Sequence, residues 1–72
     1  MDEAQRLENG RRVGRRYGCM LITDGRDSLR FKRMIGRYYR PAIAAAVCAG
    51  IDDISERPEL YDVIAAQEGT SQ

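Results

Sequence analysis

The stretch "GRRVGRRYG", residues 10–18, decides the fold of this chain. It places three glycines four residues apart and puts an arginine pair in each gap. In a helix these glycines lie on one face and form a bare ridge against which another helix packs closely. In an extended segment the same residues form a pliable basic strip that binds an anion. The choice between the two determines which kind of partner the chain has.

Local signals over residues 10–26 favour different structures. A helix through three glycines costs about 1 kcal/mol per glycine relative to alanine, which close packing against an alanine-rich helix would offset. The pairs "NG" at 9–10 and "DG" at 24–25 are instead favoured in hairpin turns. Between them "YGCMLIT", residues 17–23, has the composition of a strand. We expect an extended or hairpin segment at 17–23, with a continuous glycine-faced helix as the alternative.

The clearest element is "DSLRFKRMIGRYYR", residues 27–40, which has the pattern of an amphipathic helix. Asp27 or Ser28 is suited to cap its start. Its apolar residues recur at i, i+3, i+4 and i+7 and are Phe31, Met34, Ile35 and Tyr38. A basic stripe lies about 140° away on the helical wheel and consists of Arg30, Arg33, Arg37 and Arg40.

Proline and glycine divide the second half of the chain. Pro41 ends the preceding helix and begins the next one, "PAIAAAVCA", for which Gly50 is the expected C-terminal stop. The adjacent acids "DD" at 52–53 then form a turn. A last helix is predicted in "SERPELYDVIAAQ", residues 55–67, with Ser55 as its cap and proline in its first turn. Its expected buried side consists of Leu60, Tyr61, Val63 and Ile64.

These elements predict a mainly helical, small single domain of about three to four short helices. A short N-terminal β-hairpin, which would make the fold α+β, is the alternative. The domain spans residues 1–72, with a basic half at 1–40, an acidic and apolar helical half at 41–68 and a frayed tail at 69–72. Residues 2–9 begin it as a helix with acids in the first turn.

Size and composition argue against an enzyme. A chain of 72 residues has a thin core and little room for a substrate pocket. It has no histidine, and its two cysteines, Cys19 and Cys48, match no zinc spacing. We therefore expect no catalytic residue, metal, cofactor or small-molecule substrate. A disulfide between the cysteines stays open, although two reduced thiols in a cytoplasmic protein fit better with the lack of a signal peptide or membrane span.

The net charge of +1 hides a strong polarity between the two halves. Residues 1–40 carry eleven basic and five acidic residues, whereas residues 41–72 carry one basic and six acidic residues. This asymmetry indicates an anionic partner, or a chain that pairs its own halves or those of a second copy. The candidate binding residues are Arg11, Arg12, Arg15, Arg16, Arg30, Arg33, Arg37 and Arg40, with Tyr39 among them.

Two functional hypotheses follow. The first is a nucleic-acid-binding regulator whose arginine-rich face follows a phosphate backbone. The second is a small inhibitor or adaptor, of the kind phages and plasmids encode, that occludes a site on a larger protein machine. A homodimer is expected under both, because a thin core leaves apolar surface to cover. The residues for self-association or the core are Phe31, Met34, Ile35, Tyr38, Ile43, Val47, Leu60, Tyr61 and Ile64.

Overall fold

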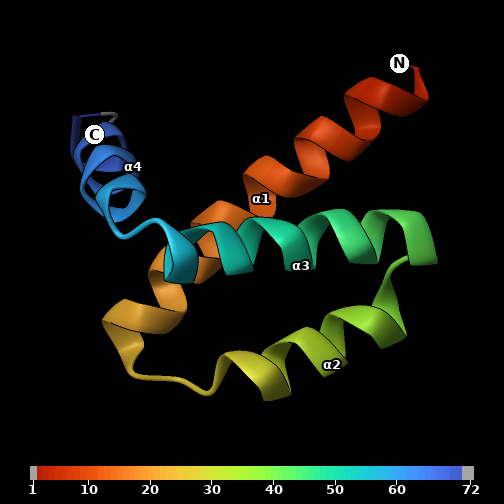
Figure 1. Cartoon of the computed structure of the whole chain (residues 1–72), viewed down its shortest axis with the longest axis horizontal. Coiled ribbons are helices and arrows are strands. Elements are labelled where there is room, and N and C mark those ends of the chain that lie inside the picture. The colour runs from red at the N-terminus through yellow and green to blue at the C-terminus, as the bar shows by residue number, and fades with distance from the viewer. Residues whose placement is uncertain (1, 71–72) are drawn as a thin grey trace.

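The computed structural model describes residues 2–70 and consists there of four helices with no strand (Figure 1). The helices are α1 (Glu3–Asp24), α2 (Ser28–Tyr38), α3 (Pro41–Glu56) and α4 (Glu59–Thr70). The predicted mainly helical fold is confirmed. The expected hairpin or extended segment at 17–23 is wrong, because those residues lie inside α1.

The glycines of α1 pack against α3, and this contact explains why the helix continues through them. Gly10, Gly14 and Gly18 are all buried. A Cβ built on Gly10 would lie 3.2 Å from the Ala46 side chain, and one on Gly18 would lie 2.8 Å from the Ile54 side chain. The order of these contacts shows that α1 and α3 cross while running in the same general direction (Figure 1).

The crossing is closest at Gly14 and Gly50. A Cβ on Gly14 would overlap the backbone carbonyl of Val47, and a Cβ on Gly50 would overlap the backbone carbonyl of Arg11. Backbone therefore packs directly on backbone, which only glycine permits. Gly50 is buried in the middle of α3. Its predicted role as a C-terminal stop is wrong, since its missing side chain serves the helix crossing instead.

The pair "DG" at 24–25 ends a helix and does not form a hairpin turn. Gly25 has a left-handed backbone, with φ of 65°. Its N–H donates to the carbonyl of Ile22 over 3.2 Å, and the N–H of Arg26 donates to the carbonyl of Leu21 over 2.9 Å. These two bonds are the Schellman pattern, in which glycine supplies the positive φ. Hairpin turns and helix ends need the same conformation, so the local signal could not separate them.

Helix α2 returns along α3, joined to it by a two-residue corner (Figure 1). Asp27, one of the two predicted caps, caps the start of α2, because its carboxylate accepts from the N–H groups of Leu29 and Arg30. Ile35 is buried in the core. Lys32 donates to Asp52 of α3 over 2.7 Å, and this bond raises the pKa of Lys32. Apolar packing and an ion pair thus both contribute to holding the two helices together.

Near Pro41, the start of α3 agrees with the prediction, whereas the end of α2 differs from it. Pro41 begins α3 at its first position, as expected. Helix α2 ends at Tyr38, with Tyr39 and Arg40 in extended conformations. The predicted helix over 27–40 is therefore two residues too long. Proline disfavours a helical conformation in the residue before it, which accounts for the early end.

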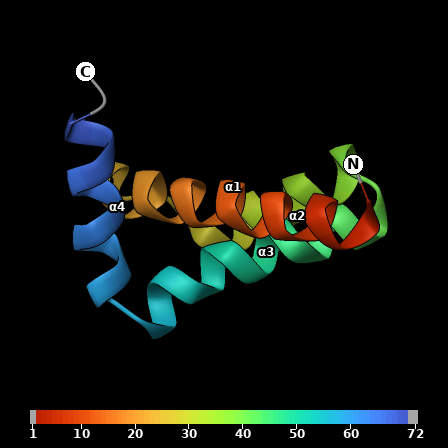
Figure 2. The ribbon, with the colours of Figure 1, turned by 90° about the horizontal axis from the view of Figure 1, so that it is seen from above.

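Helix α4 lies across one end of the other three (Figure 2). The Thr23 and Tyr61 hydroxyls hydrogen-bond over 2.8 Å and connect it to α1. Helix α3 continues to Glu56, so the predicted turn at 52–53 and the cap at Ser55 are both wrong, and Pro58 lies just before α4. Val63 is exposed. The predicted frayed tail at 69–72 is helical as far as Thr70, and residues 71–72 lie outside the described chain.

The core lies between α1, α2 and α3. It consists of Leu21, Ile35, Ala44, Val47 and Ile51, with Tyr17, Phe31, Ile43 and Cys48 packed partly against it. Of the predicted apolar residues, Ile35 and Val47 are buried, and those that are half-buried are Phe31, Ile43, Leu60, Tyr61 and Ile64. Met34 and Tyr38 lie on the surface. The apolar stripe of α2 is therefore wider than the surface its neighbours cover.

Candidate functional site

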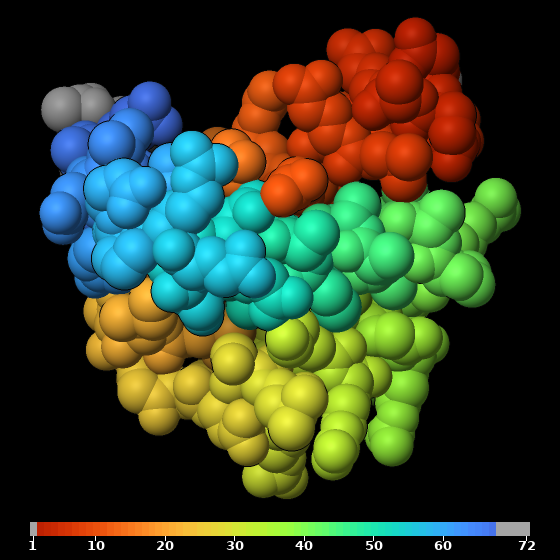
Figure 3. Space-filling model, viewed as in Figure 1, coloured from red at the N-terminus to blue at the C-terminus, as the bar shows by residue number. Residues whose placement is uncertain are grey.

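Helix α2 carries four basic residues and no acidic one. It forms one edge of the molecule, and long side chains project from it (Figure 3, yellow to green). Lys32 faces α3 and bonds to Asp52, whereas Arg30, Arg33 and Arg37 lie on the exposed side. The helix therefore divides its charge between an internal ion pair and an outward cationic face.

These arginines line a groove of about 670 Å³ beside the end of α1, which we call the arginine groove. Its lining residues are Leu21, Arg26, Asp27, Arg30, Phe31, Arg33, Met34 and Arg37. Arg26 reaches it because the helix end at Gly25 turns the chain, and its own N–H is fixed to Leu21. The groove combines four guanidinium groups with three apolar side chains from two helices.

The electrostatic character of the arginine groove is cationic. Asp27 is its one carboxylate, and that group already accepts two backbone N–H bonds as the cap of α2. The structure shows no ion pair between the four groove arginines and any other residue of 2–70. A guanidinium group has five N–H donors in a planar fork that suits two oxygens of a phosphate or carboxylate. The groove is thus chemically fitted to bind an anion.

Two arginines predicted for the binding face are used inside the molecule. Arg11 donates to Asp53 through Nε and Nη2, both over 2.7 Å, and Arg15 donates through Nε over 2.9 Å. Asp53 is only 4% exposed. The bonds from Arg11 hold the pKa of Asp53 well below its ordinary value, burial opposes them, and Arg15 adds to the lowering. Here the basic and acidic halves of the chain pair with each other.

The remaining predicted residues lie away from the arginine groove. Arg12 and Arg16 are exposed on α1. Arg40 is also exposed, but it lies at the corner before α3 and so leaves the helical stripe of α2. Tyr39 lines a different cavity. The structure therefore brings together Arg30, Arg33 and Arg37 and separates the others from them.

Sequence reasoning missed Arg26 as a groove residue. Arg26, Arg30, Arg33 and Arg37 are spaced by four, three and four residues. This is the spacing of one helical face, and it was a signal in the sequence. It was overlooked because Arg26 precedes the cap at Asp27 and so lies outside the helix. The turn at Gly25 places it in line with the others nonetheless.

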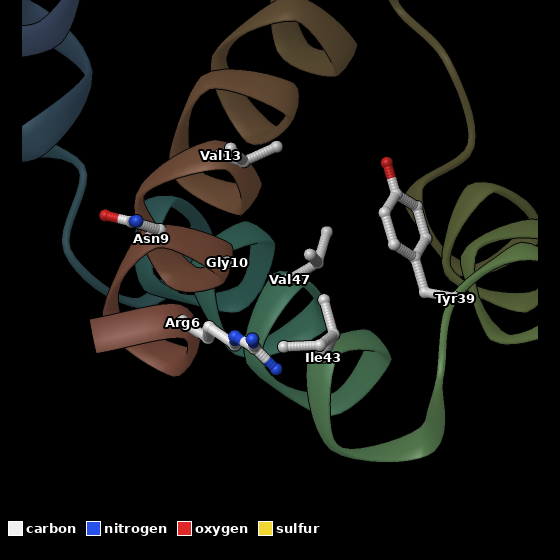
Figure 4. A pocket seen from close by; sticks show the side chains of 7 residues that line it. All are labelled: Arg6, Asn9, Gly10, Val13, Tyr39, Ile43 and Val47. Atoms are coloured by element: carbon white, nitrogen blue, oxygen red, sulfur yellow. The ribbon is translucent and has the colours of Figure 1, made fainter. Parts of the chain in front are cut away.

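A second cavity, of about 260 Å³, lies between the first half of α1 and the corner that joins α2 to α3 (Figure 4). We call it the apolar cleft; it is lined by Arg6, Asn9, Gly10, Val13, Tyr39, Ile43 and Val47. Tyr17 lines neither cavity but interacts with one lining residue of each. Its ring contacts Phe31 edge to face, with centroids 5.2 Å apart, and its pKa is raised mainly by a hydrogen bond with Tyr39 and also by burial.

The part of the chain that the structure describes contains no assembled metal site and no activated thiol. No group of three or more potential metal ligands occurs there. Cys19 and Cys48 are not joined in a disulfide; the first is buried and the second half-buried. Burial raises the pKa of Cys48, which disfavours the reactive thiolate.

None of the described helices is long and apolar enough to cross a bilayer. In the comparisons with known proteins, no family model, no curated protein and no solved structure matches this chain.

Proposed function

We propose that this protein is a small non-enzymatic regulator that binds nucleic acid through the arginine groove. The observation that carries the proposal is the convergence of Arg26, Arg30, Arg33 and Arg37 on one groove. No acidic side chain of residues 2–70 pairs with them. An external polyanion would supply the missing partners.

The distribution of the other charges supports the same proposal. Asp52 and Asp53 pair with Lys32, Arg11 and Arg15, so these two acids do not neutralise the groove arginines. Four like charges in one groove repel one another unless an anion binds between them. A phosphate backbone offers a regular row of anions, and arginine binds phosphate oxygens in pairs.

Direct titration tests this proposal. We expect the purified protein to bind oligonucleotides at low salt, with a slope of log K against log salt near −3 to −4 for four contacts on duplex DNA, or near −3 on a single strand. The double variant Arg33→Gln/Arg37→Gln should flatten the slope by one to two units, since each lost contact removes about 0.7 to 0.9. The matched control is Arg6→Gln/Arg12→Gln, which removes the same charge outside the groove.

The result that would overturn nucleic-acid binding is equally direct. No binding to duplex DNA, single-stranded DNA or RNA below about 100 μM would exclude it, since ordinary non-specific affinity is at least that strong. The alternative is then an inhibitor or adaptor that occludes a site on a larger protein. The apolar cleft and Tyr38, which is 79% exposed, favour that alternative, because aromatic anchors dominate protein interfaces.

We also propose that the protein is a homodimer. The chain exposes 5373 Å². A folded monomer of this mass exposes about 4,500 Å², and the excess is close to the roughly 800 Å² that each partner buries in a standard interface. Exposed apolar side chains are available for such an interface: Val13 and Tyr39 line the apolar cleft, and Tyr38 adjoins Tyr39 in the sequence.

A further inference from the structure

We infer that the ligand of the arginine groove is single-stranded, with an unpaired base against Phe31 and Met34 and the flanking phosphates on the arginines. This inference rests on the proposed function and names its substrate class. It concerns the apolar side chains among the arginines, because binding of phosphate charge alone does not account for them.

The shape of the site favours a single strand over a duplex. Proteins read a duplex by inserting a protruding helix or ribbon into a groove about 12 Å wide. Here the arginines line a hollow of about 670 Å³, which lies in the range of cavities that enclose small molecules. An extruded or unpaired base is small compared with this volume and can enter the hollow. The phosphates next to that base then reach the rim.

The apolar part of the lining gives a base something to contact. Phe31 lines the groove, and the ring of Tyr17 holds it from the α1 side at an interplanar angle of 62°. Met34 also lines the groove and is 42% exposed. Aromatic rings stack on bases of any sequence, and the polarisable thioether of methionine packs well against aromatic faces. A site for phosphate alone would not require apolar side chains in its lining.

The arginines flank this apolar floor along the helix. Arg30 and Arg37 are seven residues apart on α2, which corresponds to about 10 Å along the axis, and Arg33 lies between them. Phe31 and Met34 share those same two turns. One base with a phosphate on each side therefore meets apolar and cationic side chains of a single helix. Arg26 extends the cationic wall beyond the start of α2.

The experiment compares ligands that separate bases from phosphates. Fluorescence anisotropy would measure the binding of a twelve-residue oligo(dT), an oligo(U) and an abasic oligonucleotide of equal length, together with a hairpin duplex and inorganic polyphosphate. We expect both single strands to bind at least about five-fold more tightly than the abasic chain and polyphosphate, since stacking of one base contributes that much or more. A difference between oligo(dT) and oligo(U) would distinguish DNA from RNA.

The variant Phe31→Leu tests the contact from the protein side, because it keeps an apolar side chain against Tyr17 and removes the aromatic face. We expect about five-fold weaker binding of oligo(dT) and unchanged binding of the abasic chain. Met34→Gln provides a second variant at a more exposed position, so the test does not depend on the folding of one protein. The control is Leu29→Gln, an exposed apolar residue of α2 outside the groove lining.

The outcomes separate this inference from the proposed function. Equal binding of oligo(dT), abasic chain and polyphosphate would overturn the single-strand inference and leave a phosphate-binding groove. Tighter binding of the duplex than of either single strand would overturn it as well. Failure of every nucleic acid to bind would overturn both.

Discussion

At the scale of single residues, Gly14 fixes the distance between α1 and α3. A methyl group there would overlap the carbonyl of Val47, which belongs to the backbone and cannot rotate away. We expect Gly14→Ala to destabilise the protein by at least about 2 kcal/mol, as overpacking of a tight core does. Thermal unfolding followed by circular dichroism would measure the effect.

Gly36 provides the matched control for this substitution. It lies in the exposed part of α2, and a Cβ there would meet nothing within 4 Å. Gly36→Ala should therefore stabilise the protein by about 1 kcal/mol, the difference in helix propensity. If Gly14→Ala behaved like Gly36→Ala, the close crossing would be refuted.

Asp53 makes stability depend on pH in a defined direction. Its pKa in the folded protein lies well below the ordinary 3.8, chiefly because Arg11 donates to it. Because the pKa of Asp53 is lower in the folded protein, its ion pairs stabilise the fold fully when the pH is above the ordinary pKa. This stabilisation declines as the pH falls below about 4. We expect Asp53→Asn to lose about 2 kcal/mol at pH 7, since charge-assisted bonds to a buried carboxylate disappear. Its stability should also vary less between pH 4 and 2, as urea unfolding would measure.

The comparison for Asp53→Asn is Asp62→Asn on α4. Asp62 is exposed, so its substitution should change stability at pH 7 by no more than about 0.5 kcal/mol. Equal pH profiles for Asp53→Asn and the natural chain would mean that Asp53 does not carry the acid sensitivity.

The glycines of α1 and Asp53 show which residue contacts could be predicted from the sequence and which could not. The spacing of Gly10, Gly14 and Gly18 permitted a packed ridge, and the alanine-rich partner was visible. Choosing the ridge required knowing that Gly50 meets it, which is a contact between residues 36 apart. Asp53 was read as part of a turn because nothing local shows that Arg11 and Arg15 lie opposite it.

At the scale of elements, the start of α3 lacks a side-chain cap. Arg40 occupies the cap position with an extended backbone, and its side chain accepts no bond. Serine there would accept from a free N–H at the helix start. We expect Arg40→Ser to stabilise the protein by about 1 kcal/mol. Chemical denaturation would measure this, and an unchanged or lower midpoint would contradict the geometry of the corner.

Arg40→Ser also tests whether arginines outside the arginine groove contribute less to binding than those inside it. Arg40 lies off the arginine groove, whereas Arg37 lies in it. Arg40→Ser should therefore weaken oligonucleotide binding less than Arg37→Gln does at the same salt concentration. A larger effect of Arg40 would move the binding surface toward the corner between α2 and α3.

The helices were predictable where local chemistry alone decides them. The cap at Asp27 and the proline start of α3 follow from single residues and were found in the sequence. The ends that depend on contacts were not: Gly50 lies inside α3, and Gly25 ends a helix where a hairpin was expected. The stripe of α2 was found without Arg26, because a turn outside the helix brings that residue into line.

At the scale of the whole molecule, the charge polarity favours an anionic ligand and the large surface area favours self-association. The polarity of the sequence is partly satisfied within one chain, through the pairs of Asp52 and Asp53 with α1 and α2. Of the remaining basic residues, Arg26, Arg30, Arg33 and Arg37 come together at the arginine groove, and Arg12, Arg16 and Arg40 are exposed elsewhere. Exposed apolar side chains remain in several places, among them Val13 and Tyr39 in the lining of the apolar cleft and Tyr38 next to Tyr39 in the sequence. Charge is thus available for an anion, and apolar area for a second copy.

Self-association can be tested without knowing the ligand. At roughly 50 μM we expect the protein to sediment near twice 8.2 kDa, and its melting temperature to rise with concentration, because dimerisation stabilises the folded state by mass action. Tyr38→Ser should weaken association while leaving the fold intact, since Tyr38 is almost fully exposed in one chain. Val63→Ser on α4 removes another exposed apolar group at a different place and serves as its control. A mass of 8.2 kDa with a melting temperature independent of concentration would exclude the dimer, and the apolar cleft would then be left for a different protein.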